Sequence, residues 1–224
     1  MENKEKIFKV KNIGILNFLK RVFSVIFFIP LIILPIYLGG YYFIFIYIII
    51  LLLIIDEILN IYLKSKYKIY PFLYILVTIF TFYSFIFLLL NSNDKEPFIF
   101  IIFSIWIFDT FSYLGGSILK GKKLFPKISK GKTFTGLISG FIFLFIFYLL
   151  VNSYLDYFNE VKFIDIFIIG LLAFIGDIIV SLLKRSVSLK DTGRLIPGHG
   201  GILDRMDSFI FVFFIIGITK SFFI

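Results

Sequence analysis

Long runs of apolar residues, separated by short polar stretches, dominate the chain. Seven of these runs are predicted to be transmembrane helices: Val22–Leu38, Tyr41–Ile55, Phe72–Leu90, Phe98–Leu119, Leu137–Val151, Ile164–Leu183 and Ser208–Phe223. A transmembrane helix needs about 20 apolar residues. A single helix over the first two runs would be about 50 Å long, too long for a hydrocarbon core of about 30 Å. Gly39 and Gly40 lie between these two runs and favour a turn.

Composition restricts the chain to one class of protein. Of its 224 residues, 60% are hydrophobic and 17% are charged, and the mean hydropathy is +1.02. Soluble domains carry about 25% charged residues, so a soluble enzyme, a disulfide scaffold and a disordered tail are excluded. The absence of cysteine excludes Cys–zinc sites and thiol nucleophiles. The sequence predicts an all-α, polytopic transmembrane bundle that forms one integral-membrane domain, 1–224, with N-terminal spans in 1–97 and a C-terminal half in 98–224.

Lysine and arginine residues are distributed unevenly between the predicted loops. If the N-terminus is cytoplasmic, 20 of the 23 lie on the cytoplasmic side, and Lys95, Lys162 and Lys220 lie on the other. Cytoplasmic loops of membrane proteins carry such an excess. We therefore expect seven spans with a cytoplasmic N-terminus in the cytoplasmic (inner) membrane. The net charge of +9 is interpreted as a topology signal, and no nucleic-acid partner is expected.

Two acidic residues fall inside predicted spans, Asp109 in the fourth and Asp177 in the sixth. An acid at the centre of a transmembrane helix costs about 2.5–3.5 kcal/mol and usually faces the bundle interior or a wet cavity. Helical spacing places Ser181 and Lys184 on the face of Asp177, and Ser112 on the face of Asp109. The two helices are thus predicted to present a polar face that leads toward the cytoplasm.

The stretch from Gly176 to Ser208 concentrates charge in one cytoplasmic loop and its flanks. It holds four acids, five basic residues and the only histidine: Asp177, Asp191, Asp204, Asp207, Lys184, Arg185, Lys190, Arg194, Arg205 and His199. Carboxylates hold Mg²⁺, which keeps positions open for substrate phosphates, and lysine and arginine neutralise other phosphate oxygens. This combination points to phosphoryl or nucleotidyl transfer, which depends mainly on positioning and charge stabilisation.

Two sequence blocks resemble the phosphatidate cytidylyltransferases, also called CDP-diacylglycerol synthases. The first runs over 181–207 and comprises Ser181, Lys184-Arg185, Lys190-Asp191, Gly193, Pro197, His199-Gly200-Gly201-Ile202, Asp204-Arg205 and Asp207. The second comprises Asp109-Thr110, Tyr113, Gly115-Gly116, Pro126-Lys127-Ile128-Ser129, Lys132-Thr133 and Gly136. The resemblance covers the C-terminal half of the chain, about residues 106–208, and implies that 98–224 is the catalytic half. Members of the family usually carry a glutamate where this chain has Thr135.

The resemblance implies an enzyme that transfers a cytidylyl group from CTP to phosphatidic acid, giving CDP-diacylglycerol and pyrophosphate. It implies a bound Mg²⁺, for which Asp177 and Asp204 are the first candidate ligands. Whether a second cation binds stays open. The residues expected to act on the phosphates are Lys184, Arg185, Lys190, Asp191, His199, Arg205 and Asp207. The residues expected to bind substrate are Asp109, Lys127, Ser129, Lys132, Thr133 and Ser181. Membrane lipids and a homodimer complete the expected partners, and the active site is expected to face the cytoplasm.

Two other functions stay open at this stage. A CTP-dependent enzyme that acts on another lipid phosphate or on a polyprenol would share the general design, because the lipid groove cannot be read from the sequence. A transporter of an anionic solute would also explain acids inside spans. It would not explain why acids and cations gather in one loop in this order.

Overall fold

The computed structural model describes residues 29–154, 162–193, 195 and 200–219 of the chain. Its elements in order are a helical segment Ile29–Leu38, α2 Gly40–Lys64, α3 Ile69–Asn91, α4 Glu96–Leu119, β1 Lys123–Phe125, β2 Ser129–Thr133, α5 Phe134–Tyr154, α6 Phe163–Ser186 and α7 Leu203–Thr219. The predicted helical bundle is confirmed. The antiparallel hairpin β1–β2 was not predicted, because its short basic sequence resembles an ordinary loop.

Five helices, α2 to α6, are long and apolar enough to cross a membrane. Glycines at 39 and 40 have φ angles of 66° and 56°, which suit residues without a Cβ atom, so the turn predicted between the first two runs is confirmed. The first predicted span, 22–38, and the last, 208–223, lie partly outside the described residues, and α7 has 17 residues. Seven spans and a cytoplasmic N-terminus therefore remain predictions.

α2 differs most from its predicted extent. The second apolar run was predicted to end at Ile55, just before Asp56 and Glu57. The helix instead continues to Lys64, since Ile58 and Ile61 extend its buried stripe. Helical periodicity therefore outweighs the two acidic residues that interrupt the run.

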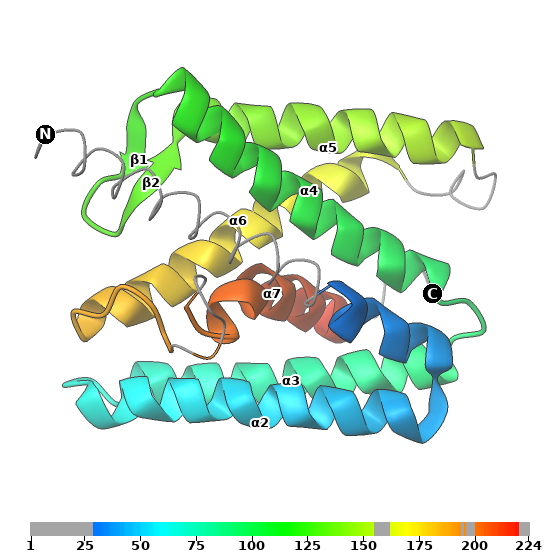
Figure 1. Ribbon diagram of the computed structural model, residues 1–224, viewed down its shortest axis with the longest axis horizontal. Coiled ribbons are helices and arrows are strands. Elements are labelled where there is room, and N and C mark those ends of the chain that lie inside the picture. Colours follow the sequence, from blue (N-terminus) through cyan, green and yellow to red (C-terminus); the bar gives the residue numbers. More distant parts are fainter. Residues whose placement is uncertain (1–28, 155–161, 194, 196–199, 220–224) are drawn as a thin grey trace, which may run out of the picture.

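The helices form three layers (Figure 1). α2 and α3 make an antiparallel pair on one side, α4 and α5 make a second pair on the other, and α6 and α7 lie between them. Large apolar side chains also cover the outside, such as Leu63 at 71% exposed and Ile118 at 72% exposed. An apolar outer surface together with an apolar interior is what a lipid environment requires.

Small residues bring α4 and α5 into close contact. A Cβ atom on Gly136 would lie 2.5 Å from the carbonyl oxygen of Ser112 and 3.2 Å from the Cα atom of Gly116. A Cβ atom on Gly140 would lie 2.1 Å from the Ser112 hydroxyl oxygen. Such contacts between small residues drive helix association in membranes, and here they fix the helix that carries Asp109.

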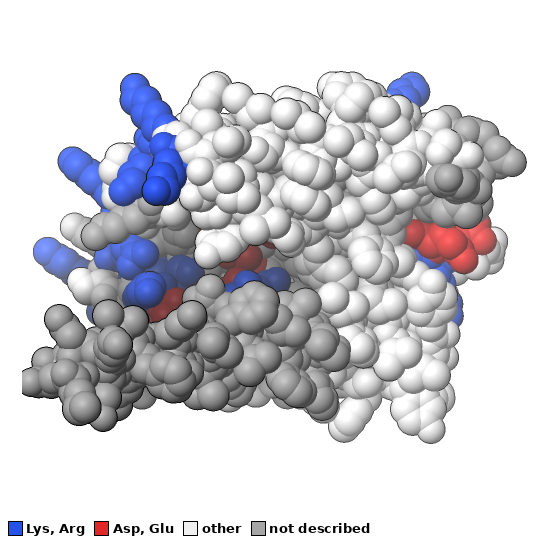
Figure 2. Space-filling model, turned by 45° about the horizontal axis from the view of Figure 1, so that its top comes forward, with Lys and Arg blue, Asp and Glu red and all other residues white. Residues whose placement is uncertain are grey.

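Basic side chains gather at one end of the bundle, which we call the basic end. It is formed by the α2–α3 loop, the hairpin and the segment after α6, and Figure 2 shows its lysine and arginine side chains in blue. At the opposite end, the described residues include only two cationic side chains, Lys95 and Lys162. This polarity agrees with the charge distribution read from the sequence.

Candidate functional site

A polar cavity of about 330 Å³ opens at the basic end among α4, the hairpin, α6 and α7. We call it the acidic cavity, and Figure 2 shows red and blue side chains inside a hollow of this face. Its charged lining consists of five carboxylates and three cations: Asp109, Asp177, Asp191, Asp204, Asp207, Lys132, Lys184 and Arg205. Ser129 and Thr133 of the hairpin also line it. The two sequence blocks therefore meet in space.

Two lysines are held against two of the carboxylates. Lys132 Nζ lies 2.9 Å from Asp177 Oδ2, and Lys184 Nζ lies 2.6 Å from Asp204 Oδ1. Both lysine side chains are largely buried, at 12% and 11% exposed. Lys132 also lies 4.7 Å from the centre of the Phe174 ring. Partly buried charges need partners of opposite sign. Each carboxylate therefore keeps a lysine ammonium group at the cavity, where it can bind an incoming anion.

Asp204 also organises the chain that leads into α7. Its Oδ2 atom accepts hydrogen bonds from the backbone nitrogens of Thr192, at 2.9 Å, and Gly201, at 3.1 Å. Asp177, in the middle of α6, accepts a weaker bond from the Ser181 hydroxyl at 3.3 Å. Asp204 therefore has a positioning role in the loop in addition to its place in the acidic cavity.

The remaining acids enter the cavity from α4, the loop and α7. Asp207 is 8% exposed, and its Oδ1 atom accepts a hydrogen bond from the backbone nitrogen of Ser208 at 2.9 Å. Ser112, beside Asp109, has a buried hydroxyl oxygen that finds no hydrogen-bond partner among the described residues. That oxygen lies against Gly140 of α5, in the contact between the two helices.

The donor chemistry of the cavity fits a magnesium ion. Carboxylate oxygens are the ligands that Mg²⁺ prefers, and five carboxylates line this one space. In the part of the chain that the structure describes, no three acids or histidines are already grouped in a metal-binding arrangement. Asp177 and Asp204, the two predicted ligands, instead contact Lys132 and Lys184. A bound ion would therefore replace lysines as their partners.

Several predicted site residues lie elsewhere. Arg185 donates to the Ile128 carbonyl oxygen and to the Leu189 carbonyl oxygen, both at 2.9 Å, so its side chain ties the hairpin to the end of α6. The side chains of Lys127 and Lys190 are exposed outside the lining of the cavity. His199 lies outside the described residues. The roles predicted for these four residues stay predictions.

Glu57 of α2 is a site residue that the sequence analysis missed. It is only 2% exposed. Its carboxylate accepts hydrogen bonds from the Thr192 hydroxyl at 2.6 Å, from the Ile202 nitrogen at 2.9 Å and from the Leu203 nitrogen at 3.0 Å. An anion at a helix N-terminus is favourable, so Glu57 caps α7 from another helix. Its position beside Ile54, Ile58 and Ile61 does not by itself distinguish a buried acid from a solvated one.

Glu57 and Asp204 together fix two chain segments, one at Thr192 and one that begins at Gly201. The backbone nitrogen of Thr192 bonds to Asp204, while its hydroxyl bonds to Glu57. Gly201 bonds to Asp204, and the next two backbone nitrogens bond to Glu57. Two carboxylates, one from each half of the chain, thereby position the start of α7 and the acids that it carries.

Gly201→Ala is expected to lower the unfolding temperature by several degrees. A Cβ atom at this position would lie 2.1 Å from both Glu57 Oε2 and Thr192 Oγ1, and overpacking of this kind typically costs about 1–3 kcal/mol. Thermal unfolding of purified protein in detergent measures the change. Gly131→Ala is the matched control, because a Cβ atom there meets nothing within 4 Å. Equal unfolding temperatures for the two variants would contradict the tight contact at Gly201.

Comparison with known sequences finds one family and a set of bacterial relatives. The sequence profile of the "Cytidylyltransferase family" matches residues 65–223. A phosphatidate cytidylyltransferase of Rickettsia prowazekii (strain Madrid E) is 40% identical over 144 residues, which cover 59% of this chain and 63% of the relative. One from Rickettsia typhi (strain ATCC VR-144 / Wilmington) is 44% identical over 116 residues, 47% of this chain and 50% of the relative.

A relative from a third organism also carries the name phosphatidate cytidylyltransferase. A phosphatidate cytidylyltransferase of Staphylococcus saprophyticus is 38% identical over 131 residues, which cover 56% of this chain and 50% of the relative. The chain thus spans less than two thirds of the length of each of these relatives. The matched profile includes every residue that lines the acidic cavity, and it begins after Glu57.

Proposed function

Because the chain belongs to the cytidylyltransferase family, we propose that it transfers a cytidylyl group from CTP to phosphatidic acid, giving CDP-diacylglycerol and pyrophosphate. The observation that carries the proposal is the acidic cavity, where both sequence blocks bring their charged side chains to one place. The relatives that are named phosphatidate cytidylyltransferase support this choice of substrates.

The proposed reaction forms one bond and breaks one bond. An oxygen of the lipid phosphate attacks the α-phosphorus of CTP, and a new phosphorus–oxygen bond forms. The bond from the α-phosphorus to the pyrophosphate oxygen breaks, and pyrophosphate leaves with the electron pair. The lipid phosphate is already anionic near neutral pH, so repulsion between two anions is the main obstacle. Charge neutralisation is therefore the chief task of the protein.

The cations of the acidic cavity are placed for this task. Lys132 and Lys184, which contact Asp177 and Asp204, are within reach of any phosphate that enters the cavity, and Arg205 lines the same space. We propose that Asp177 and Asp204 hold Mg²⁺, and that Asp109, Asp191 and Asp207 orient the cations or share the ion. When bound, Mg²⁺ would supply Lewis-acid charge neutralisation at the phosphates.

The position of the site suits one soluble and one lipid substrate. The acidic cavity lies at the basic end, which we propose to face the cytoplasm in the inner membrane because basic loops favour that side. CTP would then reach the cavity from water, while phosphatidic acid would enter from the bilayer between helices. A homodimer, a second cation and seven spans with a cytoplasmic N-terminus belong to the same proposal.

The test is the reaction itself. Purified protein in detergent is expected to convert CTP and phosphatidic acid into CDP-diacylglycerol and pyrophosphate with Mg²⁺ but not with EDTA, and ATP should not replace CTP. Both products are measured, because a phosphatase would release no liponucleotide. If folded protein with Mg²⁺ gives no product, the choice of acceptor is wrong, and other lipid phosphates and polyprenols are assayed next. Solute uptake into vesicles without consumption of CTP would instead favour a transporter.

A further inference from the structure

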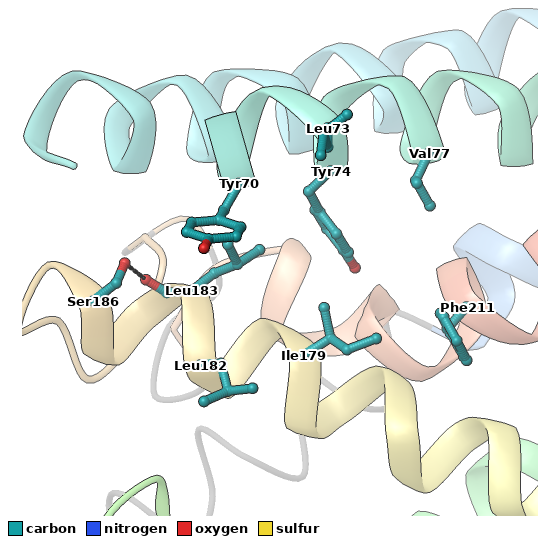
Figure 3. A pocket seen from close by; sticks show the side chains of 9 residues that line it. All are labelled: Tyr70, Leu73, Tyr74, Val77, Ile179, Leu182, Leu183, Ser186 and Phe211. Carbon is teal, nitrogen blue, oxygen red and sulfur yellow. Dashed lines mark hydrogen bonds between the residues drawn. The ribbon is translucent and has the colours of Figure 1, made fainter. Parts of the chain in front are cut away.

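A second cavity, of about 490 Å³, lies between α3, α6 and α7 (Figure 3). We call it the apolar groove. Its lining comes from three helices: Tyr70, Leu73, Tyr74, Val77, Ile179, Leu182, Leu183, Ser186 and Phe211. Leu73 and Leu182 are nearly half exposed, at 49% and 46%. Both belong to helices that are apolar enough to span a membrane, so the groove opens toward lipid rather than toward water.

The apolar groove and the acidic cavity lie on opposite faces of α6. Asp177 and Lys184 face the acidic cavity, while Leu182 and Ser186 face the apolar groove, as their helical spacing requires.

The two linings approach each other where α6 crosses α7. A Cβ atom on Gly176 would lie 2.7 Å from the carbonyl oxygen of Asp207 and 2.8 Å from Phe211 Cβ. Asp207 lines the acidic cavity, and Phe211 lines the groove. One helical turn of α7, about 5.4 Å, therefore separates the two linings.

Tyr74 lies midway along the groove, between Tyr70 and Val77 of α3. Its side chain is 5% exposed, and its hydroxyl finds no hydrogen-bond partner among the described residues. Figure 3 shows the hydroxyl pointing from α3 toward α6 and α7. A buried hydroxyl without a partner is costly. A ligand that enters the groove with a hydrogen-bond acceptor would therefore gain binding free energy by pairing with this hydroxyl.

The surroundings of Tyr74 define that acceptor. The Asp207 carboxyl group interacts electrostatically with the Tyr74 side chain, and the acidic cavity with its five carboxylates begins about one turn of α7 away from Phe211. A further anion is therefore disfavoured at this place. A phosphate is therefore a poor partner for this hydroxyl, whereas a neutral carbonyl oxygen is a good one. An apolar groove whose wall carries a buried hydrogen-bond donor without a partner among the described residues matches an acyl chain with its ester carbonyl.

The mouth of the groove suits the head-group region of a bilayer. Tyr70 at the rim packs against Tyr67, with ring centres 6.3 Å apart, and Lys66 Nζ lies 5.7 Å from the centre of the Tyr67 ring. Tyrosine and lysine side chains are typical of membrane interfaces, where lysine attracts anionic lipids. The charge at the mouth therefore complements an anionic phospholipid.

We propose that the apolar groove is an acyl-chain subsite for an ester-linked anionic glycerolipid, with the Tyr74 hydroxyl donating a hydrogen bond to an ester carbonyl oxygen. The proposal rests on the proposed function insofar as the lipid is the substrate. It adds a selectivity that the acidic cavity cannot provide, because the ester lies outside the reacting phosphates.

Binding is measured without turnover. Trp106 is the only tryptophan, so Trp106→Phe combined with Ile179→Trp places one fluorescent reporter in the groove. Phosphatidic acid with brominated acyl chains is added to the protein in detergent, and quenching is recorded against the brominated diether analogue, which lacks the carbonyls. Saturable quenching with about two- to tenfold tighter binding of the ester is expected, since one hydrogen bond is worth about that factor.

Tyr74→Phe in the same reporter protein is expected to bind ester and ether equally. It removes only a hydroxyl that has no described partner, so the fold should be unchanged. Tyr83→Phe on the same helix, where Tyr83 is 65% exposed, is the matched control and should keep the preference. In turnover assays Tyr74→Phe should raise KM for the diester substrate by the same factor and leave KM for the diether and kcat unchanged.

The outcomes separate the two proposals. Equal binding of ester and ether by the protein with an intact Tyr74, or quenching that does not saturate, would overturn the acyl-chain subsite even if cytidylyl transfer is observed. Ester-selective quenching in a protein that never consumes CTP would support the subsite and overturn the proposed reaction.

Discussion

Replacing Asp177 with asparagine is expected to lower cytidylyl transfer by at least about 100-fold, while the protein remains folded. The carboxylate lines the acidic cavity from the middle of α6 and contacts Lys132 at 2.9 Å. Asparagine preserves the shape of the side chain and removes the charge, so the cavity loses one anion and Lys132 loses its partner. Turnover and thermal unfolding of the purified variant in detergent measure the two effects separately.

Asp165→Asn is the matched control, because Asp165 lies in the first turn of the same helix, away from the acidic cavity. Its Oδ2 atom accepts a hydrogen bond from the Lys162 backbone nitrogen at 2.9 Å. An asparagine oxygen can keep that bond, so turnover should match the unmodified protein. Comparable turnover in Asp177→Asn would contradict the assignment. If Asp177→Glu needs a higher Mg²⁺ concentration for half-maximal activity, Asp177 is supported as a metal ligand. If instead the KM for CTP rises and the Mg²⁺ concentration stays the same, the role of Asp177 is to position Lys132.

Glu57→Ala is expected to destabilise the protein by about 4.5 kcal/mol or more and to remove most activity. Three donors, the Thr192 hydroxyl and the nitrogens of Ile202 and Leu203, would lose their acceptor inside the bundle. Hydrogen bonds to charged groups are worth about 1.5–3 kcal/mol each, and the start of α7 would lose its cap. Thermal unfolding in detergent and kcat with CTP and phosphatidic acid measure the loss.

Glu57→Gln tests whether the carboxylate itself is required. Both oxygens accept hydrogen bonds, Oε1 from Ile202 and Oε2 from Thr192 and Leu203. A glutamine amide group would therefore turn its NH₂ toward a donor in either orientation, and most of the loss should persist. Asp56→Asn is the control, because the neighbouring Asp56 is exposed. If Glu57→Gln and Asp56→Asn unfold and turn over alike, Glu57 does not position α7.

The apolar helices and the shared face of Asp177 and Lys184 could be predicted from sequence, because both depend on local patterns. Apolar runs indicate spans, and helical spacing places Asp177 and Lys184 on one face. Glu57 could not be found in this way. An acid just after an apolar run has the same local pattern whether it is solvated or buried, and only the packing of α2 against the start of α7 shows that this one is buried.

Local sequence patterns also could not predict which groups the basic side chains contact. Lys132 was expected to bind substrate and Asp177 to hold a metal, yet they contact each other at 2.9 Å. Sequence spacing cannot show such a pair, because the hairpin β1–β2 brings Lys132 beside α6, and the hairpin itself leaves little signal in a short basic segment. Arg185 shows the converse, since its motif position suggested a phosphate contact and its side chain bonds to carbonyl oxygens of Ile128 and Leu189.

The bonds of Glu57 have a consequence for biosynthesis. Its partners lie 135 to 146 residues further along the chain, so α2 is made and enters the membrane long before the ribosome has produced the start of α7. During that interval a carboxylate near the end of α2 has none of its final donors, and water or lipid head groups must solvate it. Non-local contacts of this kind form late. A nascent chain interrupted before α7 would therefore hold an unsatisfied charge that a quality-control protease could recognise.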